Sequence, residues 1–198
     1  MKKLTLILCF CCSLPLFANG DYQKGQKLAV VCAACHGDNG ISLNPEWPNL
    51  AGQHYSYLVK QLRDYQQGKR KSAVMAPLVA NLSAEDIKNI ATFYSQLPLA
   101  QGKTQQQYLA RGQQLYRGGD FNKHITACIA CHGPDGKGNG PAGFPVLSGQ
   151  HAAYNAQQLQ AFKNGDRNND LYGIMRDISS RMSDEDMQAV ASYTEGLH

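Results

Sequence analysis

The sequence lacks an apolar run long enough to cross a membrane. Its apolar stretch at 4–17 has about 14 residues, whereas a membrane-spanning helix needs roughly 20. Two lysines precede this stretch, and small residues follow it at Ala18 and Gly20. A basic start, a short apolar centre and a small-residue end are the three parts of a secretory signal peptide. We therefore expect residues 1–20 to be a signal peptide that is removed on export.

An excess of charge of one sign is also missing. Of the 19 basic residues, two lie in the predicted signal peptide, which leaves 17 against 15 acidic residues and a formal charge of +2. The densest basic run covers 69–71, and no basic cluster is interleaved with aromatic residues. Nucleic-acid binding needs a stronger positive patch than this. We therefore expect no nucleic-acid partner.

Cysteine is scarce in the mature chain, and the remaining cysteines are regularly spaced. Three of the seven cysteines lie in the predicted signal peptide. The other four form the segments "CAACHG" at 32–37 and "CIACHG" at 128–133, which contain Cys32, Cys35, His36, Cys128, Cys131 and His132. None of these cysteines is left without a partner in a CxxC pair. The question is whether each segment is a redox dithiol, a zinc ligand set or an attachment point.

The two cysteine segments belong to a duplicated domain. The block at 50–70 aligns with that at 147–167, and the block at 82–97 aligns with that at 182–197. The offset between the copies rises only from 96 to 100 along the chain, so the halves differ by short insertions. The longest lies at 117–125, just before the second cysteine segment.

Four segments follow from this repeat. The polar stretch 98–106 contains a proline and a glycine and is typical of a linker. We expect a signal peptide at 1–20, an N-terminal domain at 21–97, the linker at 98–106 and a C-terminal domain at 107–198. Each domain is so small that its own apolar core is marginal. A large apolar prosthetic group would supply the missing core.

The pattern of each half is helical. Apolar residues recur at helical spacing, and no run alternates as a strand requires. Short helices are expected before the cysteines, near 26–30 and 110–117, and the middle blocks stop at Gly68 and Gly165. Serines followed three residues later by aspartate predict capping boxes at Ser83 and Ser183. The predicted fold class is all-α.

Among the three possibilities for the cysteine segments, covalent haem fits best. A thioredoxin-like dithiol needs a βαβ setting, which the sequence does not offer. A zinc site would have to join the two pairs, although a repeat predicts one complete site per half, and it would leave His36 and His132 unexplained. In CxxCH, both thiols add to the haem vinyl groups and the adjacent histidine ligates the iron. We therefore predict two covalently bound haem c groups.

The repeat also selects the second axial ligands. Met75 and Met175 each lie eight residues before a predicted capping serine. Met182 and Met187 align with Leu82 and Ile87, so we expect them in the apolar core. A thioether opposite histidine suits an iron that cycles between two oxidation states. With both axial positions filled, no site is open to a substrate, and we expect an electron carrier rather than an enzyme.

Taken together, these features resemble the dihaem cytochromes c of the cytochrome c4 type. The resemblance rests on the paired CxxCH segments, on "PNLAGQ" and "PVLSGQ", on "SAVMAPL" and "GIMRDI", and on the two Ser-x-Glu-Asp helix starts. It covers essentially the whole mature chain. It implies two tandem class I cytochrome c domains, each wrapped around one haem c, whose propionates lie near the interface between the domains.

The resemblance also implies a setting and partners. These are the periplasm, association with the membrane surface, and transfer of electrons from respiratory donors to a membrane-bound terminal oxidase or another reductase. The alternatives are a cytochrome subunit of a flavoprotein dehydrogenase and, less favoured, a dihaem peroxidase. Since the surroundings of the two methionines differ, we expect the two haems to have unequal reduction potentials.

Further repeated residues are candidates for supporting roles. The resemblance implies that the carbonyl groups of Pro48 and Pro145 accept hydrogen bonds from His36 and His132. For three other pairs, contacts with haem propionates and plain helix surface both remain open: Gln53 with Gln150, Tyr57 with Tyr154, and Arg70 with Arg167. His54 and His151 also repeat; the alternatives for them are iron ligation and polar contacts at the domain interface.

Overall fold

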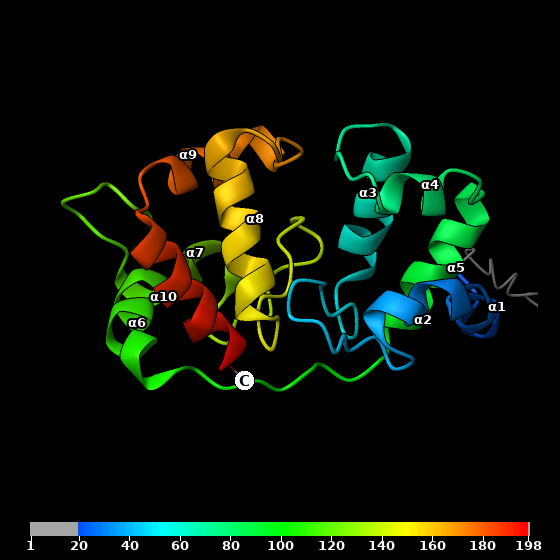
Figure 1. Ribbon diagram of the computed structural model, residues 1–198, viewed down its shortest axis with the longest axis horizontal. Helices are drawn as coiled ribbons and strands as arrows, with labels where there is room; N and C mark the ends of the chain where they lie inside the picture. Colours follow the sequence, from blue (N-terminus) through cyan, green and yellow to red (C-terminus); the bar gives the residue numbers. More distant parts are fainter. Residues whose placement is uncertain (1–19, 198) are drawn as a thin grey trace, which may run out of the picture.

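The structure, a computed structural model, describes residues 20–197, and within this range it is helical (Figure 1). Two isolated β-bridges are the only strand-like pairings in that part of the chain. The all-α prediction is confirmed. The predicted signal peptide, apart from Gly20, lies outside the described residues. No helix in the described range is long and apolar enough to cross a membrane.

In the N-terminal half, the last helix packs against two of the others. Its helices are α1 (Tyr22–Leu28), α2 (Val30–His36), α3 (Tyr55–Gln66), α4 (Met75–Val79) and α5 (Ala84–Ser95). Helix α5 packs against both α1 and α3. The helix expected before the cysteines is present as two successive helices that meet at Ala29.

The C-terminal half repeats this plan. Its helices are η1 (Gln106–Tyr108), α6 (Leu109–Gly118), α7 (Ile129–His132), α8 (Ala152–Asn164), η2 (Leu171–Gly173), α9 (Ile174–Ser180) and α10 (Asp184–Glu195). Helix α10 packs against α6 and α8, as α5 packs against α1 and α3 in the first half. The duplication read from the sequence is therefore a duplication of helix packing.

Each half has a small apolar core beside its last helix. In the first half Ile87, Ile90 and Tyr94 of α5 are buried against Leu58. In the second half the buried set includes Leu115, Tyr116, Val190 and the two methionines Met182 and Met187. The prediction that these two methionines belong to the core is confirmed.

A glycine lets the helices cross at the same place in each half. A Cβ atom on Gly25 of α1 would overlap the carbonyl oxygen of Asn89 in α5. A Cβ on Gly112 of α6 would overlap the carbonyl oxygen of Ala189 in α10. Only a residue without a side chain allows two helix backbones to touch in this way. These crossings fix the helix that leads to each cysteine segment against the last helix of its half.

Both predicted capping boxes are present. The Ser83 hydroxyl accepts from the backbone N–H of Asp86, whose carboxylate accepts from the backbone N–H of Ser83. Ser183 and Asp186 form the same pair at the start of α10. These bonds satisfy N–H groups that a helix start leaves free.

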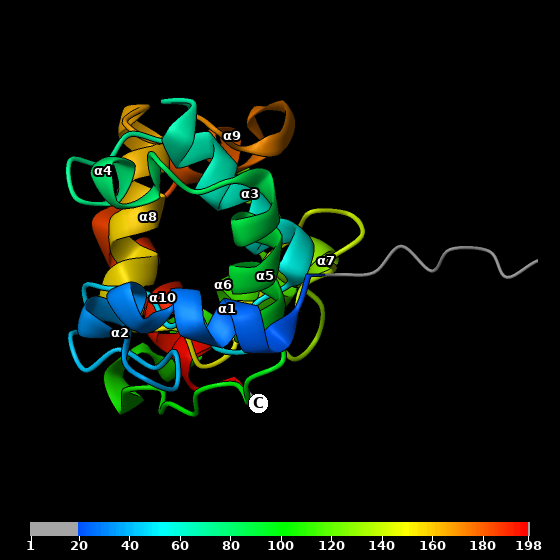
Figure 2. The same ribbon diagram turned by 90° about the vertical axis from the view of Figure 1, so that its right-hand side faces the viewer.

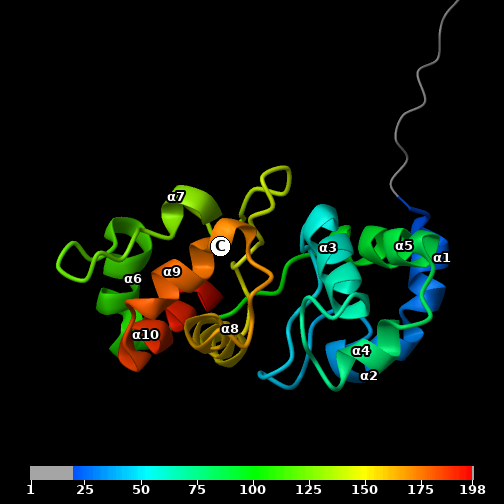
Figure 3. The same ribbon diagram turned by 90° about the horizontal axis from the view of Figure 1, so that it is seen from above.

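The two halves lie side by side along the long axis, with α3 and α8 next to the junction (Figures 1 and 3). The segment between the halves runs along one side of the molecule (Figure 1). It is packed rather than free, since Ala100 is buried against Gly149 and the Gln105 N–H donates to Ser192 Oγ at 3.0 Å.

The insertion at 117–125 is tied to the last helix of the C-terminal half by a buried carboxylate. Asp186 accepts hydrogen bonds from Arg111 and from Lys123, each at 2.6 Å. Arg111 also pairs with Asp120 at 2.7 Å. Burial alone would raise the pKa of Asp186, but the hydrogen bonds from Lys123, the Ser183 N–H and Arg111 lower it far below its ordinary value. The equivalent Asp86 is half-buried and forms no ion pair with a cation within residues 20–197.

Replacing Asp186 by Asn should therefore remove a contribution to the free energy of unfolding that the wild type loses only at low pH. A depressed folded-state pKa stabilises the protein fully above the unfolded-state value of about 4 and stabilises it progressively less as the pH falls below that value. We expect Asp186→Asn to lower the free energy of unfolding by about 1 to 2 kcal/mol at pH 7 and to flatten its decline towards pH 2. Urea denaturation at several pH values measures both effects. Asp86→Asn is the matched control, and an equally large loss there would contradict the assignment.

Candidate functional site

One helical turn brings each CxxCH set together. Cys32 and Cys35 lie three residues apart in α2, with His36 at the end of the same helix. Cys128, Cys131 and His132 repeat this arrangement at α7. Residues three and four apart in a helix lie on one face, and all six side chains line the same cavity. The four thiols are free.

A proline carbonyl holds each histidine. His36 Nδ1 lies 2.8 Å from Pro48 O, and His132 Nδ1 lies 3.0 Å from Pro145 O. A carbonyl oxygen only accepts, so Nδ1 carries the proton and Nε2 keeps its lone pair. Burial lowers the pKa of both imidazoles, although the bonds to the prolines oppose it. The expected contacts are confirmed, and each neutral ring can offer Nε2 to a metal.

The first thiol of each pair does not have the properties of a reactive redox thiol. Burial raises the pKa of the Cys32 thiol and raises that of Cys128 to about 12. Reactive CxxC pairs work through a thiolate whose pKa lies below the ordinary value. The surroundings of Cys32 and Cys128 therefore favour attachment of an apolar group over thiol exchange.

The four candidate histidine and methionine ligands line the same cavity. Met75 is the first residue of α4 and Met175 the second of α9, and both side chains line the cavity. Met182 also lines it, but it is only 3% exposed and packs in the core of the C-terminal half.

A single cavity of about 1090 Å³ contains both candidate sites. Its lining comes from both halves, including α2, α3 and α5 of the first and α8, α9 and α10 of the second. Figure 2 shows these helices around the long axis of the molecule. A ligand pocket for one small molecule usually has about 300 to 1,000 Å³. The apolar, continuous space is large enough to bring two prosthetic groups near each other.

Two glutamines join the halves through backbone groups. The Gln150 side chain accepts from the Asn49 N–H and donates to the Asn49 carbonyl, both at 2.8 Å. Gln53 accepts from the Val146 N–H at 2.9 Å and donates to its carbonyl at 3.0 Å. Both glutamines are 7% exposed. The suggestion that they are plain helix surface is wrong, because they are buried clamps across the interface.

His54 and His151 also form contacts between the halves. His54 Nε2 lies 2.7 Å from Lys137 O, and His151 Nε2 lies 2.9 Å from Ser42 O. Neither lines the cavity. The expectation of polar interface contacts is confirmed for both.

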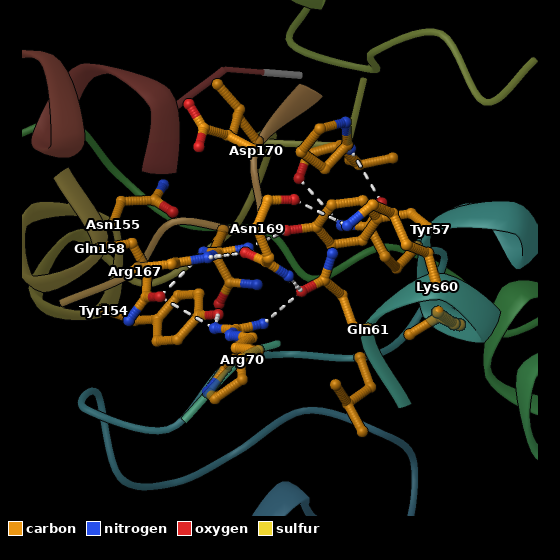
Figure 4. A pocket seen from close by; sticks show the side chains of 18 of the residues that line it. Tyr57, Lys60, Gln61, Arg70, Tyr154, Asn155, Gln158, Arg167, Asn169 and Asp170 are labelled. Atoms are coloured by element: carbon orange, nitrogen blue, oxygen red, sulfur yellow. Dashed lines mark hydrogen bonds between the residues drawn. The ribbon is translucent and has the colours of Figure 1, made fainter. Parts of the chain in front are cut away.

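Arg70 and Arg167 cross the interface in opposite directions (Figure 4). Arg70 donates to Tyr154 Oη at 2.8 Å, and Arg167 donates to Tyr57 Oη at 2.8 Å. The remaining partners of the two guanidinium groups are the side-chain oxygens of Gln61, Gln158 and Asn169. Sequence reasoning missed these three amides. Gln61 and Gln158 align at the 97-residue offset of their block, a signal that could have identified them.

The two arginines are buried positive charges without a carboxylate partner among the described residues. Arg70 is 8% and Arg167 7% exposed, and neither forms an ion pair within residues 20–197. Burial would raise the pKa of Tyr154, but Arg70 and Arg167 together lower it. A buried charge is costly unless it is paired. Haem propionates would supply this negative charge, so the residues present fit the group that the CxxCH sets predict.

Comparisons with known proteins agree with this fit. The family model described as cytochrome c matches residues 22–98 and 109–197. Cytochrome c4 of Pseudomonas aeruginosa is 42% identical over 201 residues, which cover 100% of both chains. The thiosulfate dehydrogenase electron acceptor of Thiomonas intermedia is 41% identical and aligns with 89% of this chain and 82% of its own. The crystal structure of reduced recombinant cytochrome c4 from Pseudomonas stutzeri superposes with a TM-score of 0.88 at 41% identity, covering 90% of this chain and 100% of that one.

A buried tyrosine lies near the first cysteine of each pair, and the two tyrosines provide a test of the local structure. The Tyr116 hydroxyl donates to Gly133 O at 2.6 Å, whereas the Tyr94 hydroxyl has no nitrogen or oxygen partner among the described residues and lies beside the Cys32 thiol. We expect Tyr116→Phe to lower the free energy of unfolding by about 1 kcal/mol and Tyr94→Phe to change it little. Urea denaturation of the haem-loaded protein measures both values, and equal losses would show that the two hydroxyls are equivalent.

Proposed function

Since the chain belongs to the cytochrome c family, we propose that it carries electrons between respiratory donors and a terminal oxidase or another reductase. Its two covalently bound haem c groups make it a dihaem electron carrier. Each group supplies one iron that alternates between the ferric and ferrous states. The observation that supports the proposal most is the single cavity shared by both CxxCH sets. Two irons held in one shared cavity could exchange electrons inside the protein.

The residues around the cavity have separate roles in this proposal. The thiols of Cys32 and Cys35, and those of Cys128 and Cys131, hold the two haems as thioethers. His36 and Met75 ligate the first iron, and His132 and Met175 ligate the second. Support comes from the neutral, oriented imidazoles and from the placement of both methionines at the cavity wall.

We assign the propionates to the buried arginines. Arg70 and Arg167 lie at the interface among amide and phenol groups. Propionates placed there would neutralise both charges and exclude water from the space between the haems. The two halves would then be held together by their prosthetic groups as well as by their own side chains.

The proposed setting is the periplasm. It rests on the predicted signal peptide at 1–20 and on an organisation of 21–97, 98–106 and 107–198 into two domains and a linker. Association with the membrane surface would bring the carrier to a membrane-bound oxidase. The relative from Thiomonas intermedia, described as a thiosulfate dehydrogenase electron acceptor, shows that a similar chain can receive electrons from a dehydrogenase. A role as a dehydrogenase subunit remains the alternative.

The methionine ligands can be tested by spectroscopy. Methionine bound to ferric haem gives a weak near-infrared charge-transfer band. We expect Met75→Ala and Met175→Ala each to remove about half of this band, because each removes one of two equivalent sulfur ligands. Met182→Leu is the control, since leucine occupies the equivalent position at Leu82. Loss of the band in the control, with retention in Met175→Ala, would overturn the assignment.

The carrier role can be tested by capture and kinetics. The full-length protein, immobilised under native conditions, should retain an oxidase from detergent-solubilised membranes. Stopped-flow mixing of the reduced protein with that oxidase should oxidise both haems, and a redox titration should give two unequal potentials. A stable complex with a dehydrogenase, combined with no oxidation by membranes, would instead show that the chain is a dehydrogenase subunit.

A further inference from the structure

The peptide group between Pro48 and Asn49 is hydrogen-bonded on both sides. Its carbonyl oxygen lies 2.8 Å from His36 Nδ1. Its N–H, which belongs to Asn49, donates to Gln150 Oε1 at 2.8 Å. A peptide group is planar and conjugated. One such group therefore connects the imidazole of the N-terminal half with an amide of the C-terminal half.

The same connection occurs in the other direction. Pro145 O lies 3.0 Å from His132 Nδ1. The N–H of the same peptide group, which belongs to Val146, donates to Gln53 Oε1 at 2.9 Å. Each histidine is thus reached by a glutamine of the opposite half through a single peptide group.

The glutamines cannot easily leave these positions. Each donates its own amide N–H back to the carbonyl of the residue that it clamps, Asn49 for Gln150 and Val146 for Gln53. Both side chains are buried. Two bonds to one residue fix the distance and the direction of the contact, so the chain of hydrogen bonds has a defined geometry.

Such a chain affects the electron density at the histidine. A peptide N–H that donates a bond polarises its own carbonyl, and linked hydrogen bonds strengthen one another. A stronger acceptor for the Nδ1 proton makes the opposite ring nitrogen a better donor to a metal. Greater donation stabilises the ferric state and so lowers the reduction potential.

We propose that Gln150 tunes the iron site of the N-terminal half and that Gln53 tunes the site of the C-terminal half, each through this shared peptide group. The inference rests on the proposed function, in which His36 and His132 are axial ligands. Both glutamines are positioning residues, since they act through the histidines. The potential of each haem then depends on correct docking of the other half.

The test is a crossover experiment on the full-length protein with both haems bound. Gln150→Leu should shift the redox equilibrium of the N-terminal haem about twofold to fivefold towards the ferrous state. This shift corresponds to a rise of about 20 to 40 mV in its reduction potential. Gln53→Leu should raise that of the C-terminal haem by a similar amount. Redox titrations followed by NMR, with each haem assigned through contacts to its own domain, separate the two potentials.

The His36 Nδ1 proton gives a second measurement. Its chemical shift should differ from the wild-type value in Gln150→Leu and should equal the wild-type value in Gln53→Leu. Gln150→Glu restores an acceptor for the Asn49 N–H and should return this shift towards the wild-type value. Ser56→Ala is the control, because it removes a hydrogen bond to Gly140 O between the halves without touching either proline peptide.

Two results would overturn the proposal. In one, each leucine variant changes the reduction potentials of both haems by the same amount, which indicates a general loosening of the interface. In the other, neither potential nor the His36 proton shift changes. Low-spin spectra and complete covalent haem content in every variant show that the ligand sets are intact. A failed crossover under these conditions counts against the glutamines alone, whereas loss of histidine ligation in the wild type would count against the proposed function.

Discussion

Buried backbone groups need hydrogen-bond partners, and this requirement joins the two halves. Asn49 and Val146 lie in loops at the cavity wall, outside any helix that could satisfy their N–H and carbonyl groups. Gln53 and Gln150 satisfy them from the opposite half. The docking that these glutamines stabilise also buries them. Each half therefore has backbone groups whose hydrogen-bond partners come only from the other half. The shared cavity and the convergence of two arginines at the interface depend on this exchange.

The parts of the structure that follow from short-range chemistry could be predicted from the sequence. The CxxCH spacing places its three side chains on one helical turn, and the Ser-x-x-Asp spacing defines the helix starts at Ser83 and Ser183. The helical fold and the duplication followed from periodicity and alignment. The proline contacts followed from the family resemblance, since nothing in the spacing of Pro48 alone shows where its carbonyl points.

The interface could not be predicted in the same way. Gln53 and Gln150 repeat in the alignment, but a repeat does not show that each one binds the other copy. The bonds of Gln158 with Arg70 and of Gln61 with Arg167 and Asn169 join residues roughly 100 positions apart, a separation at which local patterns carry no information. The halves also differ where their sequences do, since only the second has an insertion bound to a buried aspartate.

The shared cavity has a consequence for the order in which the protein is assembled. Cys128 and its equivalents face a space whose walls come from both halves, so docking narrows the approach to the thiols for a group as large as haem. Attachment is therefore less obstructed before docking than after it. A chain loaded in this order would form the clamp between Gln150 and Asn49 only after both haems are attached.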